Sequence, residues 1–192
     1  MRAQTLSPVA GWGWILTGFA IFRRNPITLG MLVLTYWFTV VFLNVLPYVG
    51  ALLASLVIPG LSVGLMQAAR QVERGLPIGV QTLFGSMEEN GRALIALGAL
   101  YLACTLGILG LSTLLDGGDM FRFMMSSNRA ERAALEEADF ITPALFVMAL
   151  MTPVMMAYWF APVLAAWHRL TLGRALFFSF VACWMNWRAF LV

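Results

Sequence analysis

The stretch WILTGFAIFRRNPITLGM, residues 14–31, places two arginines and an Asn-Pro pair between two apolar segments. In the first segment, Trp12, Ile15 and Phe19 follow helical spacing. An apolar stripe that carries tryptophan at its edge and arginines at its end is typical of a helix lying in the membrane interface. We therefore predict an in-plane amphipathic helix over residues 8–22, followed by a turn into the membrane.

The turn is assigned to Asn25, because asparagine tolerates the left-handed conformation at a helix C-terminus. Pro26 then suits the first turn of the next helix, where a backbone N–H would lack a helical partner in any case. The paired arginines before the turn, Arg23 and Arg24, are expected to lie among the lipid headgroups.

The composition indicates a membrane protein, since 61% of the residues are hydrophobic and only 11% are charged. A soluble domain carries about 25% charged residues. A membrane span needs roughly 20 apolar residues, and four uncharged segments qualify: 27–46, 50–67, 93–115 and 140–167. The last segment contains Pro153 and Pro162, so a kink is expected there. The predicted fold class is an all-α polytopic transmembrane helix bundle with in-plane amphipathic helices.

The chain also carries an internal repeat. Two further apolar pieces, 76–87 and 170–184, resemble the first in-plane helix. Setting Asn25 over Asn186 aligns the two ends of the chain without a gap, and Asn90 takes the same place in a looser middle copy. Each pseudo-repeat would contain an in-plane helix, an asparagine turn and a transmembrane hairpin.

We predict a single membrane domain over residues 1–192, with repeats at about 8–75 and 76–169 and a third that begins near residue 170. The third repeat lacks its hairpin. Either the chain is a portion of a longer protein with six spans, as we favour, or the third repeat is degenerate.

The charges predict the orientation in the membrane. If the four spans alternate, nine arginines fall on one side and three on the other. The positive-inside rule assigns the arginine-rich side to the cytoplasm. We therefore predict a multi-pass protein of the bacterial inner membrane with a cytoplasmic N-terminus. The opposite side receives the loop 116–139, which is net negative.

Eight of the cytoplasmic arginines are expected at headgroup depth, and we call them the arginine collar. They are Arg23, Arg24, Arg70, Arg74, Arg92, Arg169, Arg174 and Arg188. A basic residue near an anionic leaflet is worth about 1 kcal/mol, so the collar is predicted to bind acidic lipid headgroups. The same arginines are also what the topology alone requires, and the two interpretations are compatible.

The sequence offers little catalytic or metal chemistry. His168 is the sole histidine; it serves either as a proton relay or metal ligand, or, as we favour, as a cation near a helix C-terminus. One histidine without a reactive cysteine supports neither a zinc site nor a nucleophilic triad. The outer acidic residues include Asp116, Asp119 and Glu136, whose spacing matches no calcium loop. We predict no catalytic residue, no metal site and no cofactor.

Small and polar residues inside the spans have two interpretations each. Gly60 and Gly64 form a small-residue motif that lets helices approach closely, and Gly107 and Gly110 are expected to do the same. Five uncharged polar residues either line a polar path or satisfy one another and the backbone, and we favour the second interpretation. They are Asn44, Gln67, Thr105, Ser112 and Thr152.

Three strings, FRRNP (22–26), PGLSVGLMQAARQVERG (59–75) and ACWMNWRAFLV (182–192), resemble an uncharacterised family of proteobacterial six-span inner-membrane proteins. More distantly, the repeat is similar to the membrane domain attached to some glycerophosphoryl diester phosphodiesterases. The closer resemblance covers nearly the whole chain and implies a six-helix bundle with pseudo-repeats. It implies no catalytic residue, because the phosphodiesterase's catalytic domain has no counterpart in this chain.

These observations favour a non-catalytic, lipid-embedded scaffold or assembly partner that contacts acidic lipid headgroups through the arginine collar. The alternative is a transporter or lipid-handling protein with a pathway between the repeats, since proline-broken helices often mark such a site. The expected partners are anionic membrane lipids and either another protein or a second copy of the chain, and not nucleic acid. A lipid held between the second and fourth spans would favour the alternative, whereas a filled, dry interface there would count against it.

Overall fold

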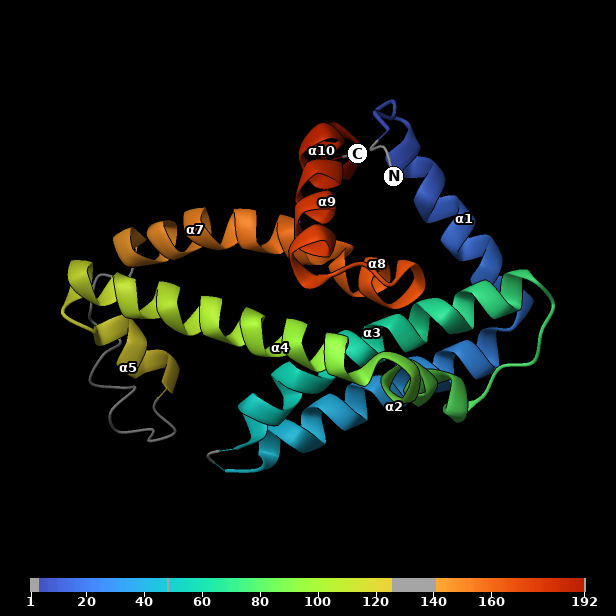
Figure 1. The fold of residues 1–192 in the computed structure, drawn as a ribbon, viewed down its shortest axis with the longest axis horizontal. Coiled ribbons are helices and arrows are strands. Elements are labelled where there is room, and N and C mark those ends of the chain that lie inside the picture. The colour runs from blue at the N-terminus through green and yellow to red at the C-terminus, as the bar shows by residue number, and fades with distance from the viewer. Residues whose placement is uncertain (1–3, 48, 126–140, 192) are drawn as a thin grey trace. The chain divides into compact units, whose positions relative to one another are not determined.

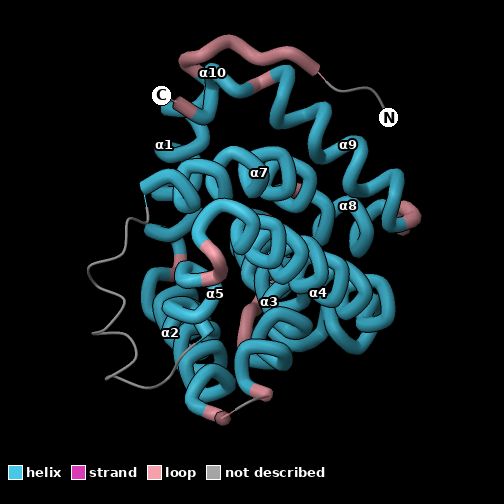
Figure 2. Tube along the Cα trace, turned by 90° about the vertical axis from the view of Figure 1, so that its left-hand side faces the viewer, coloured by secondary structure: helices cyan, strands magenta, loops and turns pink. Residues whose placement is uncertain are grey.

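The computed structural model describes residues 4–47, 49–125 and 141–191. Within these ranges the chain is helical and contains no strand, which confirms the all-α fold class (Figure 2). The helices are α1 (Ala10–Arg24), α2 (Pro26–Val45), α3 (Gly50–Glu73), α4 (Val80–Asp116), α5 (Asp119–Met125), α7 (Ile141–Trp159), α8 (Ala161–His168), α9 (Leu172–Met185) and α10 (Trp187–Phe190).

Four helical segments are long and apolar enough to cross a membrane, as predicted. They are α2, α3, α4 and the pair α7–α8, which together run over Ile141–His168 (Figure 1). The helix of the second span continues beyond residue 67, where the predicted span ends. Its last residues, through Glu73, include polar side chains and are also helical. The three predicted in-plane pieces are also helical, and they correspond to α1, the first part of α4, and α9.

The described chain divides into two compact units. One consists of residues 1–99 and 156–192, which we call the first unit, and the other of residues 100–155, which we call the second unit. Both α4 and α7 pass from one unit into the other. The arginine collar lies entirely in the first unit. The division of the chain into three sequence repeats stays a prediction.

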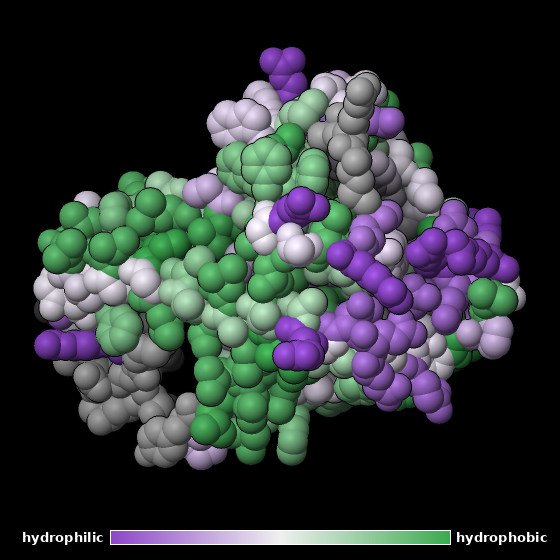
Figure 3. All heavy atoms as spheres, viewed as in Figure 1, coloured by the Kyte–Doolittle hydropathy of each residue, from purple (hydrophilic) through white to green (hydrophobic). Residues whose placement is uncertain are grey.

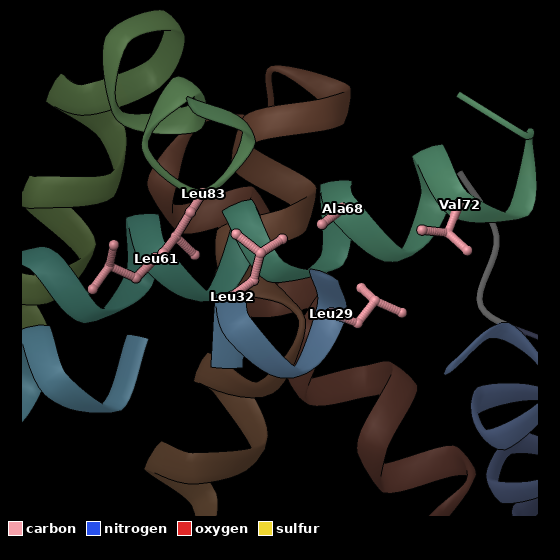
Figure 4. Packing of buried hydrophobic residues seen from close by; sticks show 6 residues of the cluster. All are labelled: Leu29, Leu32, Leu61, Ala68, Val72 and Leu83. Atoms are coloured by element: carbon pink, nitrogen blue, oxygen red, sulfur yellow. The ribbon is translucent and has the colours of Figure 1, made fainter. Parts of the chain in front are cut away.

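The main core of the first unit lies between α2 and α3. Leu29 and Leu32 from α2 meet Leu61, Ala68 and Val72 from α3, and Leu83 from α4 closes the cluster (Figure 4). Leu32 and Leu61 are almost fully buried. The antiparallel pair is joined by a connection of only a few residues, which makes it a hairpin.

Small residues permit the close packing of α3 against α4. A Cβ atom added at Gly64 would overlap the backbone of Leu83, and one added at Gly60 would overlap the Met87 side chain. The sequence prediction for this pair is therefore confirmed. It is wrong for Gly107 and Gly110, because no described atom lies within 4 Å of a Cβ built at either position.

Asn25 separates α1 from α2 by capping both helices. Its backbone N–H donates to the carbonyl of Phe22, and its side-chain oxygen accepts from the N–H of Thr28 at 3.4 Å. Pro26 occupies the first turn of α2, as expected. The left-handed conformation expected at Asn25 is not adopted, since its φ is −150° and its ψ is 67°. The side chain functions as an N-cap instead.

Asn90 and Asn186 also stand between helical segments. Asn90 has φ −130° and ψ 19° and marks a kink within α4. The predicted in-plane helix lies before this kink and the third span lies after it (Figure 1). Asn186 has φ −115° and ψ 17° and separates α9 from α10. All three asparagines thus have a negative φ outside the helical region, whatever the length of the helix that follows.

The Asn186 side chain also fastens the N-terminal segment to the end of α9. Its amide nitrogen donates to the carbonyls of Gln4 and Ala182, both at 2.9 Å. Its amide oxygen accepts from the N–H of Leu6 at 2.7 Å. Nearby, α10 lies against the start of α1, and a Cβ at Gly11 would overlap the carbonyl of Ala189. The amide is 8% exposed, and its donors and acceptor are all used.

The break between α7 and α8 falls at Phe160, two residues before Pro162, which confirms the predicted kink at that proline. Pro153 lies inside α7 without interrupting it. At the break, the hydroxyl of Ser179 accepts from the N–H of Phe160 at 2.9 Å and donates to the carbonyl of Met156 at 2.8 Å. The hydroxyl is thus inserted into one i→i−4 step of the helical ladder, a recognised cause of helix kinks.

In the second unit, Ser112 is fully buried and donates to the carbonyl of Leu109 in its own helix. Tyr101 and Met155 join α4 to α7 through an O–H···S contact of 3.7 Å. Gly117 and Gly118 have positive φ and turn the chain from α4 into α5. Residues 126–139 of the outer loop lie outside the described residues.

Candidate functional site: a polar pocket beside an interfacial helix

The first helix is exposed over most of its length, its apolar stripe included. Trp12, Ile15, Leu16 and Phe19 are all exposed, and only Gly11 is buried. Phe19, for example, is 60% exposed. The stripe is thus available to lipid, as an interfacial helix requires. At the end of the helix, Arg24 donates to the carbonyl of Glu73 at 3.0 Å and so joins the ends of α1 and α3.

Polar side chains gather over the ends of α1 and α3 and the start of α4 (Figure 3). On α3, Gln67, Arg70 and Gln71 are spaced so that they share one face. Together with residues of α4 and the end of α8 they line a pocket of about 520 Å³, which we call the polar pocket. Every residue that lines it belongs to the first unit.

The wall formed by the first part of α4 is fixed by hydrogen bonds. Ser86 donates to the carbonyl of Gly60 at 2.7 Å. Thr82 donates to the Gln71 side chain at 3.2 Å and accepts from the N–H of Gly79 at 3.3 Å. With the close contact at Gly64, these bonds hold α4 on α3 independently of any ligand.

The polar pocket also contains amides that these bonds leave unused. Gln67, Gln81 and Asn90 line it, and no described residue offers a hydrogen-bond partner to any of their side chains. Each amide carries both donors and an acceptor. The contrast with Asn25 and Asn186 is clear, because those two asparagines use their side chains to bond the protein.

Arg169 reaches the polar pocket from a strained backbone position. Its φ of 50° and ψ of 35° are left-handed, and among the described residues it is the one non-glycine with positive φ. Its N–H and that of Leu170 both donate to the carbonyl of Leu164, which closes the end of α8. Glycine normally occupies such a position, and a side chain there costs roughly 1–2 kcal/mol.

Arg70 stands between the polar pocket and a neighbouring one. Its guanidinium lies over the Trp167 ring, 4.8 Å from the centroid. Such a contact is worth about 0.5–2 kcal/mol. The neighbouring pocket, of about 570 Å³, is the side pocket; Ile21, Met66 and Ala69 supply its apolar lining, with Glu73 and His168 also present. Arg70 and Trp167 line both pockets.

The electrostatics of the polar pocket favour an anion. Arg70 and Arg169 face it with one carboxylate, that of Glu89. No described carboxylate lies within 4.0 Å of either guanidinium, and the ion pair found between described residues is Arg122–Asp119 in the second unit, at 3.9 Å. Two guanidiniums thus face one carboxylate without being paired to it.

Beneath the polar pocket the helices pack tightly. Val63, Leu94 and Ala166 form a buried cluster with Met87 and Val163 around it. Val63 and Ala166 of this cluster also line the polar pocket, so the packed cluster adjoins it between α3, α4 and α8. In the first unit the interface between the second span and the end of the fourth is therefore packed, and the polar pocket is a recess at its end.

The structure separates the members of the arginine collar into groups. Arg70 and Arg169 share the polar pocket, whereas Arg24 bonds the carbonyl of Glu73, the residue before Arg74. Arg23 lies over Phe19, and Arg188 over Trp187 in α10, beside the start of α1. Arg92 and Arg174 are exposed and line neither pocket. Headgroup binding by the whole collar stays a prediction.

Most polar residues inside the spans bond their own helix. Asn44 donates to Val40, Thr105 to Tyr101 and Thr152 to Met148, all to backbone carbonyls at 2.8–3.0 Å. Ser112 does likewise. The exception is Gln67, which faces the polar pocket. For four of the five residues, these bonds favour the interpretation that the polar side chains hydrogen-bond the backbone, and not that they line a polar path.

The remaining candidates contribute less. His168 is exposed at the last residue of α8, where a cation suits the helix dipole. Of the outer acidic group, Asp116 accepts from the N–H of Gly118 at 2.9 Å and Asp119 pairs with Arg122. The described residues contain no cluster of three or more metal-ligating side chains. Glu136, Glu137 and Asp139 lie outside the described ranges.

The sequence prediction missed several residues of the polar pocket. Trp167, Gln71, Gln81 and Ser86 were not singled out. The spacing of Gln67, Arg70 and Gln71 on α3 was a visible signal, since three polar residues on one face of an apolar helix predict a polar contact. Nothing in the sequence indicated that Arg169 would face the same space.

Comparison with known proteins supports a membrane assignment. A "probable inner membrane protein" of Burkholderia thailandensis is 36% identical over 198 aligned residues, which cover 100% of this chain and 73% of the relative. No family model matches the chain. No solved structure matches it either. With its four membrane-length apolar helices, the chain is an integral membrane protein and belongs to the same family as this probable inner membrane protein.

Proposed function

We propose that the protein is a non-catalytic, lipid-embedded scaffold or assembly partner of the bacterial inner membrane that binds anionic lipid headgroups through its arginine collar. The observation that carries the proposal is the polar pocket, in which Arg70 and Arg169 face an open recess without a carboxylate partner among the described residues. The N-terminus and the collar lie on the cytoplasmic side in this proposal, because nine of the twelve arginines share that side.

The exposed stripe of α1 supports the same arrangement. Trp12, Leu16 and Phe19 are exposed, and Arg23 and Arg24 follow at the end of the helix. A helix of this pattern lies at the headgroup boundary. The polar pocket is linked to that helix through Arg24 and the end of α3, so it would lie at about the same depth. Each arginine at this depth adds about 1 kcal/mol of attraction to an anionic leaflet.

The packing beneath the pocket favours a scaffold over a transporter. Val63, Leu94 and Ala166 fill the space between α3 and α8, whereas a transport pathway would need a polar or open route there. The six-span bundle and the distant likeness to the phosphodiesterase membrane domain belong to the same proposal. The assembly partner would be another protein or a second copy of the chain.

Native mass spectrometry of the protein released from nanodiscs that contain both anionic and zwitterionic lipid would test the proposal. The wild type is expected to retain anionic lipid, and the triple variant Arg70→Gln, Arg74→Gln, Arg169→Gln to lose it. Arg122→Gln is the matched control, because that arginine lies in the second unit and pairs with Asp119. Equal retention by the triple variant and the control would refute the role of the collar.

A further inference from the structure

The position of Arg70 between two unlike pockets suggests what kind of lipid would fit. The polar pocket on one side is lined by amides, hydroxyls and Arg169. The side pocket on the other has Ile21, Met66 and Ala69 in its wall. A phospholipid has the same order, with a phosphate diester that joins a polar headgroup to an apolar acylglycerol. This deepens the lipid-binding part of the proposed function and depends on it. Because both pockets lie between α3 and the end of α8, a lipid bound there would also support the lipid-handling alternative.

We propose that the two pockets sharing Arg70 form one phospholipid site for an anionic lipid with a neutral, hydroxylated headgroup, of the phosphatidylglycerol class. The phosphate lies at Arg70 and Arg169, the hydroxylated headgroup lies in the polar pocket, and the acylglycerol enters the side pocket. Both pockets lie within the first unit.

Two observations support the phosphate position. Arg70 is held by its contact with Trp167 at 4.8 Å, which leaves the N–H groups at the edge of the guanidinium available. A guanidinium presents its donors in a planar fork that fits two phosphate oxygens. Arg169 faces the same pocket from a left-handed position that glycine would occupy at lower cost. An arginine at this position is explained if its side chain binds an anion.

The amides favour hydroxyl groups on the headgroup. Gln67, Gln81 and Asn90 line the polar pocket and bond no described residue. An amide both donates and accepts, and so does a hydroxyl, which allows reciprocal bonding. A primary ammonium only donates, and the polar pocket offers it one carboxylate, Glu89, against two guanidiniums. An ethanolamine or serine headgroup is therefore expected to bind less well than glycerol.

The size of the polar pocket agrees with a small headgroup. Its volume of about 520 Å³ falls within the range of roughly 300–1,000 Å³ found for small-molecule sites. Below it, the cluster of Val63, Leu94 and Ala166 closes the way into the bundle. The side pocket, which Met66 and Ala69 line in part, offers the acyl chains an apolar wall instead.

Competition in native mass spectrometry would test the site. Detergent-solubilised protein would be mixed with equal amounts of phosphatidylglycerol, phosphatidic acid, phosphatidylserine and phosphatidylethanolamine, all with the same acyl chains. We expect phosphatidylglycerol to be retained about three- to tenfold over phosphatidic acid, as one or two net hydrogen bonds would give. The double variant Gln67→Met, Gln81→Ala should lose this preference and still retain anionic lipid.

Asn44→Ala is the matched control, because it removes an amide that bonds its own helix outside the pocket. Arg70→Lys keeps the charge but not the fork, and it should weaken phosphatidylglycerol more than phosphatidic acid. Met66→Trp should obstruct the side pocket and reduce lipid retention. Soluble glycerophosphoglycerol should compete poorly; if it competed as well as the lipid, the acylglycerol position would be overturned.

The outcomes separate this inference from the proposed function. If all anionic lipids were retained equally by the wild type, the hydroxyl-reading site would be refuted and the collar would stand. If no anionic lipid were retained over phosphatidylethanolamine, both would fail. If the preference for phosphatidylglycerol survived in the double variant, the amides would not be its cause and the inference would be overturned.

Discussion

Replacing Ser179 by alanine would remove the one hydroxyl that bridges the break between α7 and α8. The hydroxyl accepts from the N–H of Phe160 and donates to the carbonyl of Met156, and its side chain is fully buried. Without it, these two buried backbone groups lose their partner. The distance between them is set by the inserted oxygen, so a direct bond would require the helix to close.

The expected cost follows from the two groups. An unsatisfied buried donor or acceptor costs about 1–3 kcal/mol. If both groups were left unpaired, the loss of unfolding free energy would be about 2–6 kcal/mol. Partial closure of the helix would recover some of this. We therefore expect Ser179→Ala to lower the free energy of unfolding by about 2–4 kcal/mol.

Ser112→Ala is the matched control. Ser112 is equally buried, but its hydroxyl donates only to Leu109 in its own helix, at 2.8 Å. That carbonyl keeps its place in the helical ladder when the hydroxyl is removed, so the cost should stay below about 1 kcal/mol. The two variants delete the same atom from equally buried positions and differ in whether the hydroxyl connects two segments.

Unfolding in mixed micelles, followed by tryptophan fluorescence over an SDS titration, would compare the two variants with the wild type. Hydrogen exchange at the Phe160 amide would give a second readout, and we expect its protection to fall in Ser179→Ala. Equal unfolding free energies for the two variants, together with unchanged exchange at Phe160, would refute the reasoning that the hydroxyl completes the ladder.

Three further predictions rest on single positions. Arg169→Gly should raise the midpoint of thermal unfolding, since the left-handed strain that it relieves costs roughly 1–2 kcal/mol. The same variant should retain less anionic lipid. A fall in both the unfolding midpoint and the lipid retention would show that the arginine is structural. Gly64→Ala should destabilise the protein, because its Cβ would overlap the Leu83 backbone. The Cβ of Gly107→Ala would meet no described atom beyond its own helix, so this variant should stabilise the helix by about 0.5–1 kcal/mol. Equal denaturant midpoints for the two variants would contradict the close packing at Gly64. Burial raises the pKa of the Cys183 thiol from 9.0 to about 11, so its contribution to stability is complete below pH 9 and is lost as the pH rises through that range. Alkylation of Cys183 by N-ethylmaleimide at pH 8, measured by peptide mass spectrometry, should be slow in the folded protein and fast in SDS, and rapid labelling of the folded form would refute the burial.

The sequence was sufficient to predict the elements whose causes are local. The four spans follow from uninterrupted apolar runs, and the helix before Asn25 follows from the spacing of its apolar residues and its terminal arginines. Breaks at Asn25 and Pro162 were also predictable, because side-chain capping and the missing proline N–H act within one turn of the residue. The conformation at Asn25 was mispredicted, since asparagine can function either as a C-cap or as the N-cap of the next helix.

The pocket depended on contacts that no local pattern contains. Arg70 and Arg169 are far apart in sequence, and only the packing of α8 beside α3 brings them to one recess. The small-residue pairs show the same limit. Gly60 and Gly64 approach α4 closely, while a Cβ built at Gly107 or Gly110 meets no described atom beyond the backbone of its own helix. A small residue permits a close approach, but the position of the partner helix decides whether one occurs.

The bonds between Asn186 and the N-terminal segment set an order for the synthesis of this protein. Leu6 and Gln4 bond a residue 180 and 182 positions later in the chain. At a translation rate of roughly 5–20 residues per second, this delay is about 10–40 s. During that interval the start of α1 has neither α10 nor the Asn186 amide to hold it. The nascent N-terminal segment would therefore remain accessible to insertion factors and proteases until the ribosome has passed residue 186.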